Sequence, residues 1–306
     1  MDKIQKFFVS EMEISKDFLR KIFEKFYARI SPRKEEVNKM NYFPIPDCDT
    51  GDNLAATLRG VIRGIKQGGY LSKKDLINSL QEEILLEAGR GNAGVIFTGW
   101  FAGFLNSLKE GLVLNAETLS QAMEEGKNWG YRVFDKPREG TILDPISISA
   151  QTALLVSQRE KNLISLFEEI ISRAKISVEK TTEKLDDLLK ERNTPREIKA
   201  LKKKKVVDAG ALGFLIFLES FQEVIMEKIK ERGGAVVVIK GKENLDREVL
   251  KKRFSPLGDS LDINISPSSK NATIHIHTDF PEKIAEISLE FGEIKDFRIE
   301  DLTEEV

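Results

Sequence analysis

The sequence predicts an α+β protein with two parts, a large all-α part followed by a small α/β part. Apolar residues recur at three- and four-residue spacing through most of residues 1–232, which is the period of an amphipathic helix. After Gly233-Gly234 the apolar residues alternate with polar ones, which is the period of a strand. A chain of 306 residues suffices for two domains. We therefore expect one domain at residues 1–232 and a second at residues 235–306.

The first part contains roughly eight or nine predicted helices, separated by short breaks that hold Gly, Pro or Asn. The clearest of them cover residues 15–30, 53–65, 71–88, 93–111, 116–134 and 163–191. Almost no strand signal is present there, so the pattern favours a large antiparallel helix bundle. The lysine run in "ALKKKKVVDAG" is typical of a solvated face, and contact with phosphate is the alternative.

The second part alternates between strand and helix patterns. The sequence predicts a strand at 235–241, a helix at 246–258, a hairpin of strands at 260–266 and 272–278, a helix at 281–292 and a strand at 293–301. This β-α-β-β-α-β order is the ferredoxin-like arrangement. We therefore expect a small ferredoxin-like domain after the helices.

Composition narrows the class of protein. The net charge of −2 argues against a general nucleic-acid binder. The single cysteine, Cys48, excludes an internal disulfide and suits a reducing cytoplasm. The first residues lack the apolar stretch of a signal peptide, and no uninterrupted apolar run is long enough to span a bilayer. We expect a cytoplasmic protein without a membrane span.

The stretch "NYFPIPDCDTGDN" predicts a metal site. Pro44 and Pro46 each fix their own φ and push the preceding residue toward extended geometry. In extended chain the side chains of Asp47 and Asp49 point the same way. Asn53 then opens a helix, so carboxylates converge beside a helix start, where they repel one another unless a cation joins them. Mg²⁺ prefers such oxygen ligands and usually shares them with phosphate.

This aspartate loop has three alternative interpretations. A calcium EF-hand loop needs Gly at its sixth position and Glu at its twelfth, where this chain has Asp52 and Leu58. A dehalogenase-type phosphatase needs a buried hydrophobic strand before its aspartates, and "FPIP" is not one. The remaining alternative is a turn whose aspartates only cap the helix. One cap needs one carboxylate, whereas three are present.

A second cluster, "EAGRGNAGVIFTG", predicts an anion site. Gly89, Gly91 and Gly94 match G-x-G-x-x-G, but the motif follows a predicted helix and not the strand that a dinucleotide fold requires. The Lys-Ser/Thr of a P-loop is also missing. Glycines and Asn92 at the start of an apolar helix nevertheless offer backbone N–H groups to an anion. A tight helix-helix turn with close packing at Gly94 is the alternative.

Two later loops look similar. "KPREGTILDPI" places Gly140 and Thr141 before a helix, and "VVDAGALGFLIF" places Asp208, Gly210 and Gly213 before another. Each alone indicates only a helix start. If all four loops lie at one end of the bundle, their positive helix termini surround the acidic cluster, which predicts a metal-nucleotide site built from helix dipoles.

Taken in order, "NYFPIPDCDTGDN", "GRGNAGVIF", "EGTIL" and "VVDAGALGFL" resemble the nucleotide-binding domain of bacterial fatty acid kinase. That domain is similar to the ADP-binding L subunit of dihydroxyacetone kinase. The tail "ATIHIHTDFPEKIAEISLEFGEIKDFRIEDL" resembles the middle domain of fatty acid kinase. The resemblance implies an eight-helix antiparallel barrel that binds Mg²⁺ with ATP or ADP at one end. It also implies phosphorylation of a fatty acid carboxylate, presented by a separate DegV-like carrier protein, to an acyl phosphate for phospholipid synthesis.

The resemblance also implies roles for individual residues. Asp47 and Asp49 match the metal-binding aspartates at the catalytic centre. The nucleotide-facing positions are matched by Thr50 and Asn53 near the phosphates, by Gly91, Asn92 and Gly94 at the phosphate-facing helix start, by Thr141 in the second nucleotide loop, and by Asp208 and Gly210 in the third.

Some positions depart from the family pattern. Asp52 stands where a small or neutral residue is expected, so it is either a third Mg²⁺ ligand or a cap. His275 and His277 match two ligands of a metal in the middle domain, but "GGAVVVIKG" lacks the third ligand, a Cys. We expect Zn²⁺ there only if Asp279 or another acid supplies that ligand. The alternative is two strand residues on a half-buried or interface face.

The carrier-docking third domain of fatty acid kinase has no counterpart before Val306. Either a separate chain supplies it or this chain has a narrower role. Two function classes stay open: an ATP-dependent phosphotransferase acting on a carboxylate or on a small hydroxyl compound, as in dihydroxyacetone kinase, and a nucleotide-binding regulatory module. The only histidines are His275 and His277, so the first domain cannot carry a covalent dihydroxyacetone-histidine intermediate. A homodimer also stays open.

Overall fold

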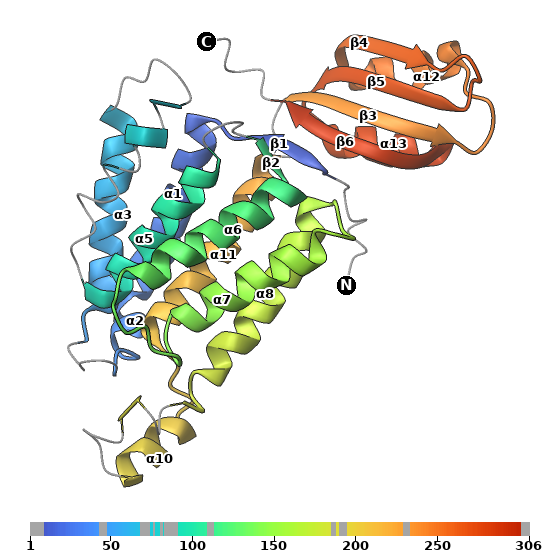
Figure 1. Cartoon of the computed structure of the whole chain (residues 1–306). Helices are drawn as coiled ribbons and strands as arrows, with labels where there is room; N and C mark the ends of the chain where they lie inside the picture. The colour runs from blue at the N-terminus through green and yellow to red at the C-terminus, as the bar shows by residue number, and fades with distance from the viewer. Residues whose placement is uncertain are drawn as a thin grey trace.

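The computed structural model describes residues 9–42, 48–67, 74–75, 77–79, 82, 91–108, 113–184, 188–189, 195–228 and 233–300. Helices form one body, and a sheet with two helices projects from one end of it (Figure 1). The α+β class predicted from the sequence is confirmed. Pro44, Pro46, Asp47 and Gly89, and most of the helix predicted at 71–88, lie outside the described residues.

The described helices follow the predicted segments closely, because the apolar period sets which face each helix buries. Their bounds are α1 (Lys16–Ile30), α2 (Lys34–Asn38), α3 (Thr50–Gln67), α5 (Gly91–Ser107), α6 (Ala116–Arg132), α7 (Leu143–Val156), α8 (Leu163–Lys180), α10 (Pro195–Lys203) and α11 (Ala209–Lys228). Side-chain caps mark several starts. Ser15 Oγ accepts from the Phe18 N–H at α1, and Asn115 and Thr118 cap one another reciprocally at α6.

Helix α11 is the core of the helical body. Its rings Phe214, Phe217 and Phe221 are fully buried, and Phe217 packs 5.6 Å from Phe26 and 5.3 Å from Trp100, measured between ring centroids. Among the described helices, α11 alone is long and apolar enough to cross a membrane by length and composition. However, 72% of its most apolar stretch is buried inside the protein, which is the behaviour of a core helix.

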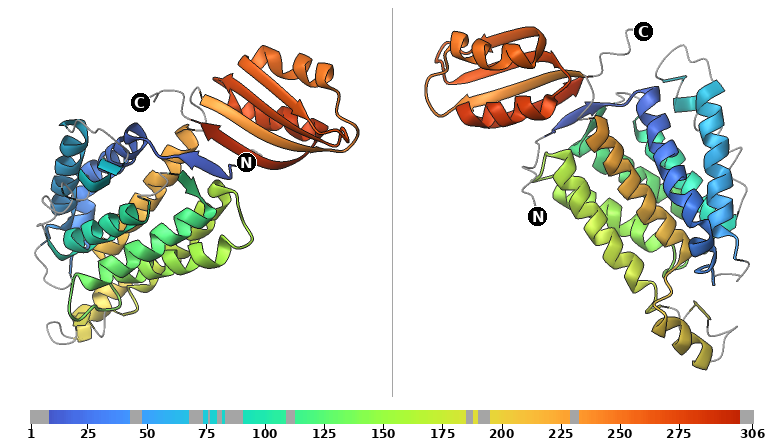
Figure 2. Two further views of the ribbon diagram at one scale, coloured as in Figure 1. Left: turned by 45° about the horizontal axis from the view of Figure 1, so that its top comes forward. Right: turned by 180° about the vertical axis from the view of Figure 1, so that it is seen from behind.

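The second part has the predicted order of elements. These are β3 (Gly233–Gly241), α12 (Arg247–Phe254), β4 (Gly258–Ile265), β5 (Asn271–Thr278), α13 (Pro281–Phe291) and β6 (Gly292–Glu300). All strand pairs among them are antiparallel, in the spatial order β6-β3-β5-β4. Helices α12 and α13 cover one face of this sheet, as the two further views show (Figure 2).

Two strands of the first part were not predicted. β1 (Glu11–Glu13) runs parallel to β6 and antiparallel to β2 (Val113–Asn115), which gives one six-stranded sheet in the order β2-β1-β6-β3-β5-β4. The stretch before α8 is tied to the same place, because the Val9 carbonyl accepts from the Leu163 N–H at 2.7 Å. The sheet therefore includes residues from both sides of Gly233-Gly234.

Candidate active site

The starts of four helices meet at the end of the helical body away from the sheet (Figure 1). A Cβ atom placed on Gly91, at the start of α5, would lie 2.8 Å from Asn53 Nδ2 in the first turn of α3. One placed on Gly210, at the start of α11, would lie 2.9 Å from Ala93 Cβ and 3.2 Å from Ile142 Cβ. The loops before α3, α5, α7 and α11, which are far apart in the sequence, are therefore brought together.

Glycines permit this close approach one turn further along the helices as well. A Cβ atom on Gly213 would come within 2.7 Å of Leu54 Cδ1, so α11 and α3 pack almost backbone to side chain. At Gly94 the nearest atom would be Thr57 Oγ1 at 3.8 Å, an ordinary contact distance. The small residues of these motifs thus serve helix packing, and Gly91 and Asn92 stay exposed at the end.

The described part of the aspartate loop begins at Cys48, which is exposed and has a φ of 54°. The Asp49 carbonyl accepts from the Asn53 N–H at 2.9 Å, and α3 starts at the buried Thr50. Asp49 itself is half-buried, and among the described residues no cation pairs with its carboxylate. Asp47, its predicted partner, lies outside the described residues. A carboxylate at a helix start without a protein cation is suited to a metal ion.

Asp52 has partners of its own on α2. Lys34 Nζ lies 2.8 Å from its Oδ1, and Asn38 Nδ2 donates to its Oδ2 at 2.7 Å. The hydrogen bond and charge of Lys34 hold the pKa of Asp52 below its usual range. Asn38 Oδ1 also accepts from the Gly51 N–H at 2.7 Å. Both oxygens of Asp52 are therefore used to fasten α2 to α3, and Asn38, which the sequence reasoning missed, caps α3 from outside.

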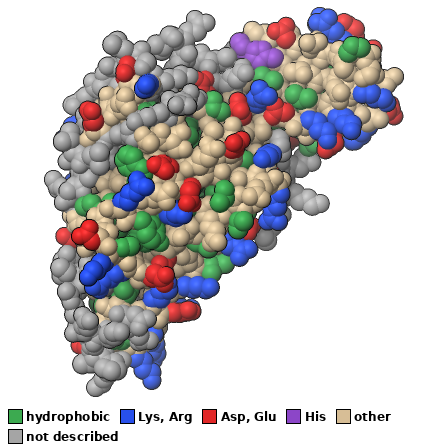
Figure 3. Space-filling model, viewed as in Figure 1, with side chains coloured by type: hydrophobic (Ala, Val, Ile, Leu, Met, Phe, Trp, Pro, Cys, Tyr) green, Lys and Arg blue, Asp and Glu red, His purple; other side chains and the backbone are tan. Residues whose placement is uncertain are grey.

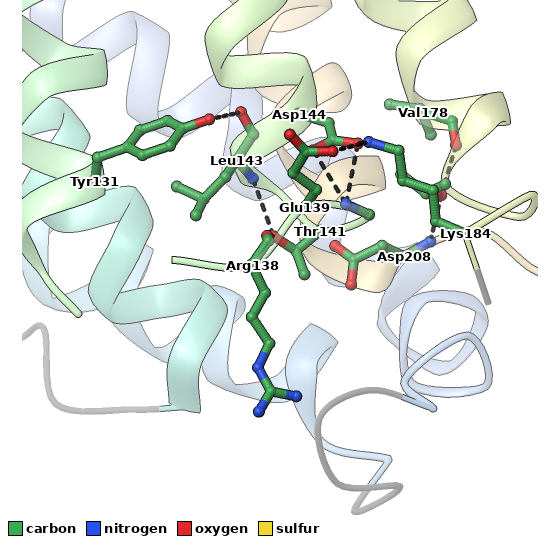
Figure 4. A network of polar contacts seen from close by, with 11 residues as sticks. Tyr131, Arg138, Glu139, Thr141, Leu143, Asp144, Val178, Lys184 and Asp208 are labelled. Carbon is green, nitrogen blue, oxygen red and sulfur yellow. Dashed lines mark hydrogen bonds and ion pairs between the residues drawn. The ribbon is translucent and has the colours of Figure 1, made fainter. Parts of the chain in front are cut away.

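The loop before α7 is held by a carboxylate four residues on. Gly140, with a φ of 82°, donates its N–H to both oxygens of Asp144 at 3.1 and 3.0 Å. Thr141 Oγ1 donates to the Arg138 carbonyl at 2.8 Å, and the Thr141 side chain is buried. Lys184, from the end of α8, reaches the same carboxylate (Figure 4). No motif pointed to Asp144 or Lys184 in advance.

Asp208 links the starts of α11 and α7. Its Oδ1 accepts from the Ala211 N–H at 2.7 Å, as a helix cap, and its carboxyl also takes a hydrogen bond from the Ile142 backbone. Loss of water around the carboxyl raises its pKa to about 7, although these hydrogen bonds oppose the shift and the side chain keeps some contact with solvent. The negative charge of Asp144 pushes the pKa in the same upward direction. Near neutral pH, Asp208 is thus partly protonated.

The two histidines lie together at the far end of the molecule. The rings of His275 and His277 are 5.1 Å apart and nearly perpendicular, and His277 Nδ1 is 3.8 Å from Asp259 Oδ1. They occupy the face of the sheet opposite α12 and α13, visible at the surface (Figure 3). Within the part of the chain that the structure describes, no group of three or more His, Cys, Asp or Glu could hold a metal ion.

The chemistry available at the four helix starts follows from their charges. Each helix start concentrates partial positive charge on unpaired N–H groups, which favours an anion such as phosphate. Asp49 adds negative charge at the same place, which favours a divalent cation between it and that anion. Such a combination suits a metal-bound polyphosphate.

Comparisons with known proteins divide the chain in two. Residues 44–223 match the family model described as the DAK2 domain, and residues 224–306 match the model of a fatty acid kinase-like middle domain. Uncharacterized proteins of Staphylococcus aureus strains USA300 and COL are each 25% identical over 308 residues, which is 90% of this chain and 53% of theirs. The chain thus spans about half the length of the curated relatives it matches.

Among solved structures, the dihydroxyacetone kinase of C. freundii is similar in two forms. The native form has a TM-score of 0.48, and the complex with AMP-PNP and Mg²⁺ has a TM-score of 0.46. Both are 18% identical, over 73% of this chain and 36% of the other.

Proposed function

This chain belongs to the DAK2-domain family, with a fatty acid kinase-like middle domain after it, and from that premise we propose that it is an ATP-dependent phosphotransferase. It binds Mg-ATP at the four converging helix starts and transfers the γ-phosphoryl group to a fatty acid carboxylate, which gives an acyl phosphate. The observation that carries the proposal is the meeting of Asn53, Gly91, Ile142 and Gly210 at one place.

The residues present fit a metal-nucleotide. Gly91 and Asn92 are exposed, so their backbone N–H groups are reachable by phosphate, and Asp49 has no cation partner among the described residues. On this proposal Asp47 and Asp49 hold Mg²⁺, Thr50 and Asn53 lie near the phosphates, and Asp52 stays with Lys34 and Asn38. The metal ion neutralises charge on the phosphates when bound.

Phosphoryl transfer asks a protein mainly for positioning and electrostatic stabilisation. The N–H groups at the starts of α5, α7 and α11 supply that stabilisation without lysines, because each start carries partial positive charge. The buried Thr141 and the capping Asp208 fix the second and third nucleotide loops. Residues 1–232 contain no histidine, so no covalent histidine intermediate is part of this proposal.

The acceptor side of the proposal rests on the middle domain. A fatty acid is too apolar to wait free in water, so we propose that a DegV-like carrier presents its carboxylate in the cytoplasm, in the service of phospholipid synthesis. A separate chain supplies the carrier-docking part. The helical part, residues 1–232, then corresponds to the family's eight-helix barrel. The β6-β3-β5-β4 order with α12 and α13 on one face supports a ferredoxin-like domain at 235–306.

The test combines binding with turnover. Calorimetry should detect Mg-ATP binding by the chain alone, with slow turnover. Adding fatty acid together with a DegV-like carrier should raise turnover and form acyl phosphate, trapped as a hydroxamate with hydroxylamine. Stimulation by dihydroxyacetone or another small polyol, with none by carrier and lipid, would replace the fatty acid by a small hydroxyl acceptor. Mg-ATP binding that no acceptor converts into turnover would instead indicate a regulatory module.

A further inference from the structure

Lys184 joins the end of α8 to the loop before α7. Its Nζ lies 2.8 Å from Asp144 Oδ2 and 3.0 Å from Glu139 Oε2. Its stem packs on the same loop, because a Cβ atom on Gly140 would lie 2.9 Å from Lys184 Cβ. Figure 4 shows the lysine reaching both carboxylates from the α8 side. The lysine thus contacts the loop through both its charge and its hydrocarbon chain.

The two carboxylates are not equivalent. Asp144 has only 13% of its side chain exposed, whereas Glu139 has 85% exposed. An exposed ion pair contributes little, but a mostly buried carboxylate without a partner is costly. The pair that matters is therefore Lys184 with Asp144. Since both oxygens of Asp144 accept from the Gly140 N–H, this carboxylate also sets the left-handed conformation of Gly140.

The same turn after α8 touches the loop before α11. The Asp208 N–H donates to Thr181 Oγ1 at 3.0 Å, and Thr182 Oγ1 donates to the Val206 carbonyl at 2.9 Å. Thr181 is 1% exposed. Residues 181–184 thus contact two of the loops that carry proposed nucleotide positions, although no residue of this turn has been assigned a role.

We propose that Lys184 is a positioning residue for the nucleotide site, an inference that rests on the proposed function. Lys184 does not touch the nucleotide. It keeps Asp144 ionised and turned toward the Gly140 N–H, and this holds Thr141 and the start of α7 at the site. Without the lysine, Asp144 has two ways to relieve its buried charge: it takes up a proton, or it turns out to water. Either change weakens its grip on Gly140.

Four variants test this. Lys184→Met removes the charge and keeps a stem that packs on Gly140, and Lys184→Arg restores the charge. Glu139→Gln removes only the exposed partner. Lys127→Met is a matched control, since Lys127 is also a partly exposed lysine that pairs with a carboxylate, Glu124, but within α6. Each is measured for Mg-ATP affinity by calorimetry and, without nucleotide, for amide hydrogen exchange of the segment around Gly140.

We expect Lys184→Met to weaken Mg-ATP binding and to speed exchange around Gly140, each by roughly fivefold or more. Lys184→Arg, Glu139→Gln and Lys127→Met should stay within roughly twofold of the wild type. Unchanged exchange in Lys184→Met would overturn the inference, as would faster exchange with unchanged affinity. If the wild type binds no Mg-ATP, the proposed function fails, and the exchange measurement still decides whether Lys184 orders the loop.

Discussion

Asn53, in the first turn of α3, lies directly against Gly91, the first residue of α5: a Cβ atom on Gly91 would come within 2.8 Å of the Asn53 side-chain nitrogen. Gly91 also has a φ of 72°, where a side chain is strained. The amide of Asn53 and the backbone of Gly91 therefore fit together only because Gly91 has no side chain. This contact joins the aspartate loop to the glycine-rich loop.

Replacing Gly91 should damage binding more than stability. We expect Gly91→Ala to lower the free energy of unfolding by about 1–2 kcal/mol, because the positive φ is strained with a Cβ atom. Mg-ATP affinity should fall further, by about tenfold or more, because Asn53 is displaced at the phosphates. Urea unfolding and calorimetry measure the two effects.

Gly94→Ala provides the contrast. Its added Cβ atom would meet only Thr57 Oγ1 at 3.8 Å, and Gly94 lies inside α5, where Ala is the better helix former by about 1 kcal/mol. The free energy of unfolding should therefore stay level or rise. Equal destabilisation by both substitutions would show that the positive φ of Gly91 is not the cause.

The second prediction concerns the proposed metal. Asp49→Asn removes a charged ligand and nearly keeps its shape, so the Mg²⁺-dependent part of ATP binding should weaken at least tenfold, about 1.4 kcal/mol. Asp246→Asn is the matched control, because Asp246 caps the distant α12 and Asn caps helices equally well. Calorimetry with and without Mg²⁺ compares the two. Equal Mg²⁺-dependent binding by wild type and Asp49→Asn would leave only the helix-cap alternative for this loop.

The features found from the sequence have local causes. Helix periodicity reflects which face is buried, and the strand, helix, strand, strand, helix, strand order of residues 233–300 follows from changes of period within short windows. The four glycine-rich loops were recognisable because backbone N–H groups at helix starts need small or capping neighbours. In each case the residues that cause the structure lie within a few positions of it.

The features that were missed depend on partners far along the chain. β1 has three residues, too few for an alternating pattern, and it exists because Glu11 pairs with Arg298. Lys184 lies in a charged stretch that is typical of a solvated surface, and only packing brings it to Asp144. Asn38 gives no signal for capping a helix that starts twelve positions later, at Thr50. Such contacts follow from tertiary packing, which a single sequence does not display.

The third prediction concerns zinc. His275 and His277 offer two nitrogens on one sheet face, and Asp259 is the acid whose distance to His277 is known, at 3.8 Å. Structural zinc sites hold four ligands at about 2.0–2.3 Å. We therefore expect protein purified without added metal to contain zinc well below one equivalent by elemental analysis. Stoichiometric zinc that His277→Ala removes would contradict this and would restore the zinc site implied by the resemblance.

The last prediction concerns pH and the carboxyl of Asp208. Its pKa is about 7 in the folded protein and 3.8 as the ordinary value, so between these pH values the folded state binds a proton that the unfolded state does not. Stability from this group is therefore complete below about pH 4 and is lost as pH rises to about 7. Asp208→Asn removes the titration and keeps an oxygen that accepts from the Ala211 N–H.

The difference in unfolding free energy, Asp208→Asn minus wild type, should therefore grow as pH rises from 4 to 7. The limit is about 1.4 kcal/mol per pH unit, the effect of one proton. The side chain keeps some contact with water, so the measured slope should lie below this limit. Urea unfolding at a series of pH values gives the difference directly, and Asp246→Asn makes the same chemical change at an exposed helix start. Parallel curves for wild type and Asp208→Asn would mean that Asp208 is ionised throughout, and that its link to Ile142 and Ala211 is that of an ordinary charged cap.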